Sequence, residues 1–545
     1  MKTLYYNGCV FAGEQPIHQA FLVENGVFTN VGTNEALLSL PHDEQVDLKS
    51  TFVCPGFNDS HMHLLNLGNT MAMCPLGDAA SLDDVLGRLQ AFAQEKKLSS
   101  GQWLLGRGWN QDYFSPATGM PTRDDLDKVS REMPICIVRC CGHALCVNSR
   151  ALQLLGITEN TPCPDGGTIC RDESGRLNGI FLDAAMPLVQ GRLPAPTVAD
   201  MKSMLLSAMK TLNSVGVTSC QTDDLLAFEN VKWQDVLQAY QQLEAEGRMT
   251  VRVYEQSQFT SPEGLQAFLD AGWKTGVGNE MFKIGPLKML GDGSLGARTA
   301  LLRDGYADAP SEKGLGLFTQ EQFDQMISLA HERGMQCAVH VIGDGVLDRV
   351  LSAYEKAFAR CPRKDHRTAL IHVQLTRPEQ LEKIKALGLS AHVQTIFLDY
   401  DSHIVYQRAG KQLAETSYAF RTMQRMGIPL SNGTDCPVEN PHPLRGIQCA
   451  VTRQPLNASL PPYRPEEKMT VEQALHSYTA AGAYASFEEN FKGKIAPGMA
   501  ADFVLLSQSP FTVPPEQLQH IRVLATFLGG KKVYAGLNSP ITGEP

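Results

Sequence analysis

Short hydrophobic runs alternate with amphipathic stretches through the middle of the chain. Eight of these runs have the length and composition of buried strands, at residues 52–60, 215–223, 249–257, 282–290, 335–341, 368–373, 388–396 and 428–434. Between the later runs, helical periodicity predicts helices over 320–333, 346–360 and 377–387. Eight strands that alternate with helices predict an α/β fold of the TIM-type (β/α)8 barrel class.

The first interval between predicted strands is too long for a single crossover helix. About 150 residues separate His63 from Val215, although a strand-helix-strand unit needs only about 30 or more. We therefore expect a barrel domain over 55–489 that carries an inserted subdomain after its first strand, at about residues 75–210.

Both ends of the chain differ from the middle because they alternate like strands and lack helical periodicity. Segments such as AFLVENGVFTNVG near the start and ADFVLLS near the end have this character. The simplest packing joins residues 1–54 and 490–545 into one small composite β-sandwich domain.

Composition and charge exclude several classes of partner. With 43% hydrophobic and 19% charged residues in 545, the chain has the composition of a soluble globular protein, and it has no run long enough to cross a bilayer. A net charge of -10 without a basic stripe argues against nucleic acid as a partner. The start of the chain lacks the pattern of a secretory signal, so a cytoplasmic location is expected.

Six residues with metal-binding potential end these hydrophobic runs. They are His61, His63, Lys288, His340, His372 and Asp435. The carboxyl ends of parallel barrel strands meet at one mouth, so residues there converge although they are far apart in sequence. Residues two apart on a strand point to the same side, so His61 and His63 can bind one divalent ion, and Asp59 is placed to orient one imidazole.

Each of these residues also has a simpler interpretation. A buried histidine such as His340 or His372 can be a core residue bonded to backbone, and Asp435 can be a solvated turn residue. Lys288 can be a substrate-binding or surface lysine, because an ammonium repels metal ions. Condensation with carbon dioxide would convert it into a carbamate, an anion able to bridge two cations. The presence of all six residues together favours a two-metal hydrolase site, with Asp435 as catalytic base.

Longer motifs carry a resemblance to a known family. The stretches PGFNDSHMH, KMLGDGSLGARTA, HVIGDG, IHVQ, SNGTDCPVENPHPLRGI and GKIAPGMAADFVLL resemble the amidohydrolase superfamily, in its amidohydrolase 3 or YtcJ-like branch, and are similar to N-substituted formamide deformylase. The resemblance implies a barrel flanked by a β-sandwich. It also implies one metal ion on His61, His63 and Asp435, a second on His340 and His372, and a bridging carbamate on Lys288.

The activity implied by the resemblance is hydrolysis of a carbon–nitrogen bond, in an amide or formamide-like small molecule. A metal-activated hydroxide would attack, and Asp435 would act as proton shuttle. Two divalent ions are expected, and the nitrogen-rich ligand set favours Zn²⁺. Two alternatives remain: a mononuclear deaminase or cyclic-ureide hydrolase of the same superfamily, and a non-catalytic regulatory or binding barrel. The intact ligand set argues against the second of these.

Loops around the barrel mouth supply the candidate substrate contacts. These are Trp109, His143, Asp292, Arg298, Gln374, Gln394 and Arg421. In the inserted segment, Trp109, Tyr113 and Phe114 are expected to form an apolar lid, which would suit a substrate with an aryl or alkyl group. A homodimer is the expectation from the class of enzyme.

Overall fold

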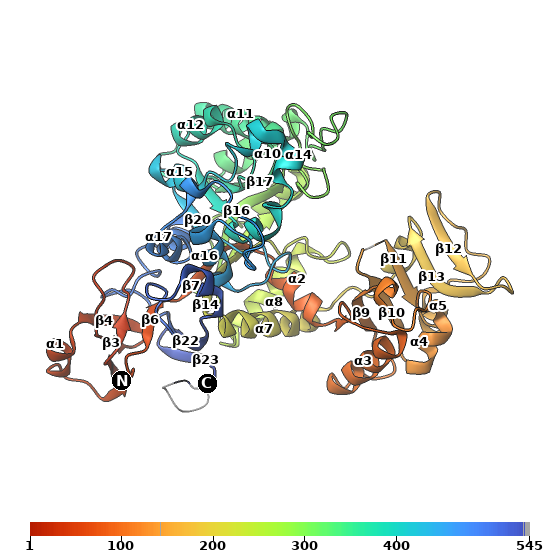
Figure 1. The fold of residues 1–545 in the computed structure, drawn as a ribbon, viewed down its shortest axis with the longest axis horizontal. Helices are drawn as coiled ribbons and strands as arrows, with labels where there is room; N and C mark the ends of the chain where they lie inside the picture. Colours follow the sequence, from red (N-terminus) through yellow and green to blue (C-terminus); the bar gives the residue numbers. More distant parts are fainter. Residues whose placement is uncertain (142, 538, 540–545) are drawn as a thin grey trace. The chain divides into compact units, whose positions relative to one another are not determined.

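The computed structural model describes all residues except 142, 538 and 540–545 (Figure 1). The chain forms two compact units. The larger unit comprises Met1–Asn66, Leu205–Ala227 and Lys232–Pro545, and the smaller unit comprises Leu67–Met204 and Phe228–Val231.

Eight parallel strands form the centre of the larger unit (Figure 1). In chain order, which is also their order in the sheet, they are β7 (Phe57–Met62), β14 (Val217–Thr222), β15 (Arg252–Gln258), β16 (Phe282–Leu290), β17 (Cys337–Val341), β18 (Ala369–His372), β19 (Ser390–Val393) and β20 (Leu430–Asn432). The chain after β20 meets the end of β7, because the Asp435 N–H donates to the His61 carbonyl at 2.8 Å. The predicted barrel is confirmed: six of the eight predicted runs contain one of its strands, and the runs 52–60 and 249–257 overlap β7 and β15, which end one or two residues later.

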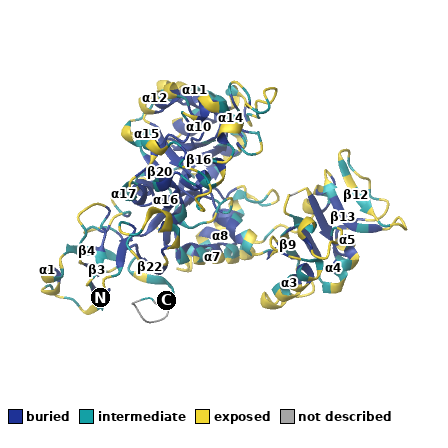
Figure 2. Ribbon diagram, viewed as in Figure 1, coloured by how far each residue is buried: buried dark blue, intermediate teal, exposed yellow. Residues whose placement is uncertain are grey.

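Helices connect the successive barrel strands. They are α8 (Trp233–Ala245), α9 (Pro262–Asp270), α10 (Gln320–Glu332), α11 (Asp344–Arg360), α12 (Pro378–Ala386), α13 (Leu398–Asp401), α14 (Val405–Ala414), α15 (Phe420–Arg425) and, after the last strand, α16 (Pro443–Thr452), α17 (Val471–Ser477) and α18 (Ala480–Ala485). The start of α10 shows why a helix begins there: Thr319 and Gln322 form a reciprocal capping box that satisfies two free N–H groups. These helices cover the barrel strands, which are largely buried (Figure 2).

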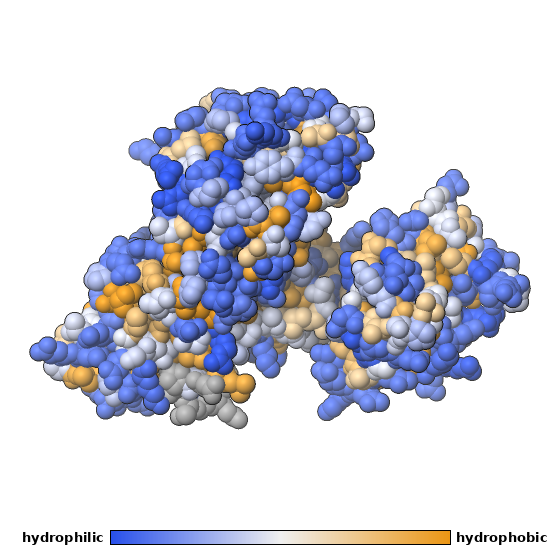
Figure 3. Space-filling view, in the orientation of Figure 1, coloured by the Kyte–Doolittle hydropathy of each residue, from blue (hydrophilic) through white to orange (hydrophobic). Residues whose placement is uncertain are grey.

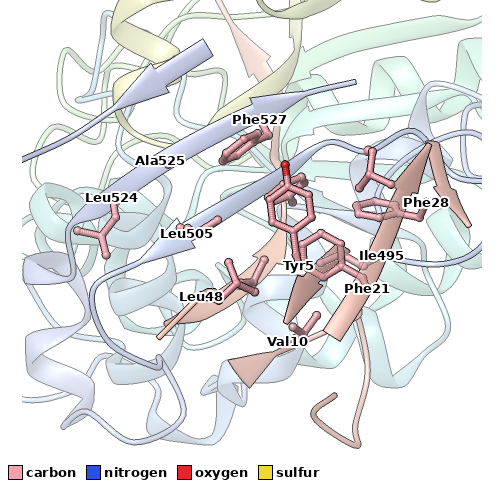
Figure 4. Packing of buried hydrophobic residues seen from close by; sticks show 14 residues of the cluster. Tyr5, Val10, Phe21, Phe28, Leu48, Ile495, Leu505, Leu524, Ala525 and Phe527 are labelled. Atoms are coloured by element: carbon pink, nitrogen blue, oxygen red, sulfur yellow. The ribbon is translucent and has the colours of Figure 1, made fainter. Parts of the chain in front are cut away.

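Segments from both ends of the chain form two further sheets within the larger unit. A four-stranded sheet has the order β4 (Val27–Gly32), β3 (Ala20–Glu24), β1 (Lys2–Tyr6), β5 (Glu44–Asp47), and a five-stranded sheet has the order β2 (Cys9–Val10), β6 (Phe52–Pro55), β21 (Phe503–Leu506), β22 (Val523–Leu528), β23 (Lys531–Ala535). Aromatic rings from both ends share one core, which includes Phe21 from the start of the chain and Phe527 from its end (Figure 4). The Phe503 ring joins them, because its centroid lies 5.0 Å from that of Phe21 and 4.3 Å from that of Phe527.

The predicted strand over 52–60 is in fact two strands separated by Gly56. β6 pairs within the five-stranded sheet, whereas β7 pairs within the barrel. The Gly56 N–H donates to the Asp502 carbonyl at 3.0 Å, and a Cβ at this position would lie 2.2 Å from Oγ1 of Thr218. Glycine therefore lets the chain pass from one sheet into the other without a loop.

The smaller unit has a sheet and a hydrophobic core of its own. Its six strands have the order β12 (Gly167–Arg171), β13 (Leu177–Asp183), β11 (Ala144–Val147), β10 (Ile135–Arg139), β9 (Leu104–Trp109) and β8 (Cys74–Pro75), with helices α3 (Leu82–Glu95), α4 (Arg123–Val129) and α5 (Ser149–Leu155). The helix α3 buries Val85 and Leu89 in the same cluster as Leu104 and Ile137. The helix α2 (Leu64–Met71) leads into this unit, and α7 (Val198–Ser214) leads out of it.

Hydrophilic residues dominate the surface on the face drawn in Figure 3, and hydrophobic residues form small separate patches there. Among the described residues, no helix combines the length and the apolar character needed to span a membrane.

Candidate metal centre

The carboxyl ends of five barrel strands, β7, β16, β17, β18 and β20, bring all six predicted ligands together. The His61 ring lies 5.2 Å from the His63 ring and 5.6 Å from the His372 ring, and the His340 ring lies 4.4 Å from that of His372. Asp435 Oδ1 lies 3.3 Å from Nε2 of His61. Nζ of Lys288 lies 3.0 Å from the same nitrogen. Residues at the ends of the first and the last barrel strands therefore lie together in one small volume.

His61 presents one defined nitrogen to this volume. Its Nδ1 contacts Oε1 of Gln256 at 2.8 Å, while the Gln256 amide NH₂ donates to the Ser60 carbonyl at 3.1 Å. The second bond fixes which end of the amide faces the ring, so Nδ1 carries the proton and Nε2 has a free lone pair. Burial, followed by the charge of Lys288, lowers the pKa of His61 well below its usual value. The imidazole is therefore neutral and able to bind a cation.

His372 is oriented in the same way by a glutamine. Its Nδ1 contacts Oε1 of Gln394 at 2.6 Å, and the Gln394 NH₂ donates to the His392 carbonyl at 3.2 Å. Burial and then the neighbouring His340 lower the pKa of His372 well below its usual value. Its backbone adopts a φ of 73°, which is uncommon for a residue other than glycine and which turns the chain as β18 ends. Gln394 thus orients a ligand, although the sequence had suggested it as a substrate contact.

His340 has the opposite arrangement. Its Nε2 contacts the Gly293 carbonyl at 3.1 Å, so this nitrogen carries the proton and Nδ1 has the free lone pair. Asp292 Oδ1 also lies 3.3 Å from Nε2. Three of the four histidines are therefore oriented by a hydrogen bond at one ring nitrogen, which leaves the other nitrogen as the atom that could bind a cation.

His63 lies between two carboxylates. Its Nε2 is 3.0 Å from Oδ1 of Asp435, and its Nδ1 contacts Oδ1 of Asp223. Burial alone would lower the pKa of His63, but Asp223 and then Asp435 raise it to about 10. The other oxygen of Asp223 lies 3.2 Å from Nζ of Lys288, whose side chain is fully buried. Burial would raise the pKa of Asp223, but His63 and Lys288 hold it below its usual value.

Asp59 has a different role from the one expected. Its carboxylate pairs with no imidazole in the described part of the chain and instead accepts hydrogen bonds from the His61 N–H at 3.2 Å and the Thr434 N–H at 3.0 Å. These donors are backbone groups at the ends of β7 and just after β20. Asp59 therefore fixes the backbone that carries two ligands, and Gln256 performs the ring-orienting role.

The donor chemistry of this cluster fits a divalent cation. Ligand atoms of His61, His63 and Asp223 lie within 4.8 Å of one another, and so do those of His61, His372 and Asp435. Neutral imidazoles with oriented lone pairs, together with carboxylates, are the groups that Zn²⁺ and similar ions bind. Side-chain or backbone acceptors that hold the second ring nitrogen are also usual around such ions.

Asp292 and Arg298, two of the predicted substrate contacts, hold the long loop after β16. The Asp292 carboxylate is buried and accepts hydrogen bonds from the N–H groups of Leu301 at 2.8 Å and Gly343 at 2.8 Å. Arg298 pairs with Asp308 of the same loop, with its Nη2 2.8 Å from Oδ2. Both side chains are thus engaged by the protein itself.

Gln374 and Arg421 also have partners within the larger unit. The Gln374 NH₂ donates to Oδ2 of Asp401 at 3.0 Å, and its buried Oε1 accepts no hydrogen bond from the described residues. Arg421 donates to the Lys468 carbonyl at 2.7 Å. Gln374 keeps a free acceptor two residues after His372, so its substrate role stays a prediction.

Trp109 and His143 lie in the smaller unit. The Trp109 side chain is 0% exposed and Phe114 is 5% exposed, and both pack in that unit's hydrophobic core. The expected apolar lid is therefore wrong for these two residues, because core packing leaves them little or no surface for a substrate. His143 is exposed and its Nδ1 lies 3.1 Å from Oδ1 of Asp183.

Sequence reasoning missed two residues of the centre, Asp223 and Gln256. Asp223 directly follows the buried strand β14 (VTSCQT), and a position after a strand end is also what identified Asp435, although the residues of β14 are mostly polar. Gln256 lies inside β15, and nothing in the sequence around it distinguishes it from an ordinary buried glutamine.

The comparisons with known proteins agree with this geometry. Residues 44–534 match the Amidohydrolase family. YtcJ of Bacillus subtilis is 33% identical over 540 residues, which cover 98% of this chain and 99% of that protein. N-substituted formamide deformylase of Arthrobacter pascens is 27% identical over 529 residues, 94% of each chain. The crystal structure of an uncharacterized metal-dependent hydrolase from Pyrococcus furiosus has a TM-score of 0.78 and 29% identity, and covers 94% of this chain and 100% of its own. The chain therefore belongs to the amidohydrolase family.

Proposed function

We propose that this protein is a metal-dependent hydrolase that cleaves a carbon–nitrogen bond, of the amide or formamide type, in a small molecule. The observation that carries the proposal is the set of oriented histidine nitrogens beside Asp435 and Lys288. The similarity to a formamide deformylase over nearly the whole chain supports the bond type.

Two divalent ions, Zn²⁺ by the nature of the ligands, would be held by His61, His63 and Asp435 on one side and by His340 and His372 on the other. A carbamate on Lys288 would bridge them. Such ions supply an activated water at neutral pH and polarise a substrate carbonyl. The position of Lys288 supports the carbamate, because its fully buried Nζ lies 3.0 Å from Nε2 of His61, among the ligand atoms that a carbamate would join.

Asp435 would move the proton in this reaction. Its Oδ1 lies 3.0 Å from Nε2 of His63 and 3.3 Å from Nε2 of His61, so it faces the space that the histidine nitrogens share. A carboxylate there can accept the proton of the attacking water and return it to the leaving nitrogen. Its φ of 59° is a backbone conformation that non-glycine residues adopt rarely, and at functional sites it is often retained for the placement it gives.

The mononuclear alternative within the same superfamily differs in the state of Lys288. In this structure Nζ lies 3.2 Å from Asp223 Oδ2, a contact that a protonated lysine also makes. An enzyme with one ion and an unmodified Lys288 would fit a deaminase or a cyclic-ureide hydrolase. The chemical state of Lys288 therefore separates the two functions.

Metal analysis tests the proposal directly. Purified protein should contain up to two divalent ions per chain, and prolonged dialysis against a strong chelator should abolish hydrolysis of N-substituted formamides or related amides. Lys288→Ala should be inactive, and short carboxylic acids with bicarbonate should partly restore it. Full activity of the chelated protein would refute the metal mechanism, and a fully metallated protein with an unmodified lysine would favour the mononuclear alternative.

A further inference from the structure

Asp223 is a buried carboxylate that contacts two of the proposed ligands at once. It follows β14, the second barrel strand, and is 3% exposed. Its Oδ1 contacts Nδ1 of His63, and its Oδ2 lies 3.2 Å from Nζ of Lys288. No other carboxylate among the described residues pairs with Lys288, and Asp435, which faces His63 from the other side, follows a different strand.

The His63 ring shows which side of it faces the centre. Its Nε2 lies 3.0 Å from Oδ1 of Asp435, and that oxygen is also 3.3 Å from Nε2 of His61. A cation shared by these three residues would therefore bind Nε2 of His63. The two nitrogens of an imidazole point in diverging directions, so Asp223 at Nδ1 lies behind the ring. A carboxylate in that position fixes the tautomer of a ligating histidine and makes it a better donor.

Asp223 would keep its contact with the nitrogen of Lys288 after carboxylation. Forming the carbamate joins Nζ to the carbon of carbon dioxide, and the lysine nitrogen keeps one N–H while its other protons pass to water. Asp223 Oδ2 is within reach of that N–H. An acceptor on this side of Nζ would direct the carbamate oxygens away from Asp223, toward the histidine nitrogens.

We propose that Asp223 is a positioning residue. One of its oxygens orients the His63 ring, and the other orients the Lys288 carbamate. The inference rests on the proposed two-metal function. It explains why one buried carboxylate faces both groups although they lie on different strands. It also adds to the six proposed ligands a residue that shapes two of them without binding the ions itself.

Two substitutions separate the two contacts. Asp223→Ala removes both. Asp223→Asn keeps one oxygen, which can still accept the N–H of His63, but its NH₂ then faces the N–H of Lys288, where an acceptor is needed. Adjacent Asp224 offers a matched control. Its carboxylate is also buried, but it accepts hydrogen bonds from the Leu65 N–H and the Tyr240 hydroxyl, and within the described residues it pairs with none of the six proposed ligands.

The test measures metal content, chelator competition and the ¹³C NMR signal of carbamate after loading with ¹³C-bicarbonate. Wild-type protein and Asp224→Asn should show the carbamate signal and equal metal affinity. Asp223→Asn should lose the signal and bind both ions about 10- to 100-fold more weakly, because the carbamate would bridge them, while Asp223→Ala, which also loses the contact with His63, should bind the ion on His63 more weakly still. Circular dichroism identifies any variant that fails to fold, and Asp223→Asn, which keeps the shape of the side chain, then decides the question.

Two results would overturn the inference while the proposed function stands. One is wild-type affinity and carbamate signal in folded Asp223→Asn and Asp223→Ala. The other is an equal loss in Asp224→Asn, which would show a general effect of disturbing this buried region. Wild-type protein that binds no ion and shows no carbamate would be a different failure, because it refutes the proposed function itself.

Discussion

Thr434 donates both its backbone N–H and its hydroxyl to the buried carboxylate of Asp59. The first residue lies next to Asp435 and the second lies two residues before His61, so the bonds join the last and first barrel strands directly beneath the metal centre. Burial raises the pKa of Asp59 to about 7, although the hydrogen bonds from Thr434 act against this. The closure of the barrel and the placement of two ligands thus depend on the same contacts.

Gly433 allows the ends of β7 and β20 to approach each other closely. A Cβ at this position would lie 2.6 Å from the His61 backbone nitrogen and 2.8 Å from Oδ1 of Asp59. Because the nitrogen cannot rotate away, Gly433→Ala should destabilise the fold by about 1–3 kcal/mol and weaken metal binding. Thermal melting and metal analysis check this. The control Gly87→Ala, in α3 with nothing within 4 Å of the added Cβ, should leave metal binding unchanged. Normal metal content in Gly433→Ala would contradict the argument.

Gln256 and Gln394 should control metal affinity without touching an ion. Gln256→Leu and Gln394→Leu each remove the acceptor that fixes a histidine tautomer, at His61 and His372 respectively. We expect metal affinity to fall about 10- to 100-fold in each variant, measured by competition with a chelator. Gln374→Leu is the matched control, since its amide bonds Asp401 instead of an imidazole. An equal fall in the control would argue against tautomer control.

Asp435→Asn separates proton transfer from folding. The asparagine keeps the shape of the side chain, and the other proposed ligands remain, so the protein should stay folded and retain at least one ion. Turnover of an N-substituted formamide should fall by about 10² to 10⁴ at each proton-transfer step that the carboxylate serves. Steady-state kinetics together with metal analysis provide the measurement. A near wild-type rate in a metallated variant would remove Asp435 from the mechanism.

Glu488 predicts a pH-dependent stability. Its side chain is buried, with Oε2 2.7 Å from Nζ of Lys492 and Oε1 2.9 Å from Nζ of Lys283. Burial alone would raise the pKa of Glu488, but the two lysines lower it to about 2 from an ordinary 4.5. Because the folded-state pKa is the lower one, the stabilisation is complete above pH 4.5 and is lost as the pH falls toward 2. The shift corresponds to about 3 kcal/mol.

The measurement compares melting temperatures of wild-type protein and Glu488→Gln across pH. The variant should melt well below wild type at pH 6, and the gap should narrow as the pH is lowered, because the wild-type carboxylate is then protonated as well. Exposed Glu382 on α12 provides a control, and Glu382→Gln should melt like wild type throughout. A gap for Glu488→Gln that stays constant down to pH 3 would mean that its ionisation contributes nothing.

The barrel could be predicted because strands buried on both faces are continuous hydrophobic runs in the sequence. The limit is visible at residues 52–60, where one run contains two strands. The break at Gly56 depends on Thr218, a residue far along the chain, and no local pattern records that contact. The position of each candidate ligand followed from the same runs, and the structure brings these residues together, although their binding of metal stays a prediction.

The contacts of side chains were harder to infer than their positions. Asp292 and Asp435 both follow barrel strands, yet Asp292 accepts backbone N–H groups and Asp435 faces two histidines. Trp109 and Phe114 suggested an apolar lid, yet both lie in a core. In each case the contact depends on which group, far away in sequence, lies next to the residue in the fold. Hydrophobic periodicity carries no such information.

Because β6 pairs with β21, the sheet that joins the two ends of the chain can form only late in synthesis. Val53 pairs with Leu505, so the edge of β6 has no partner until nearly the whole chain has been synthesised. At about 5–20 residues per second, that wait lasts on the order of tens of seconds. During this time the hydrophobic strand that leads into His61 is open to other chains. Aggregation during expression should therefore depend on the rate of elongation and on chaperones that cover this N-terminal segment.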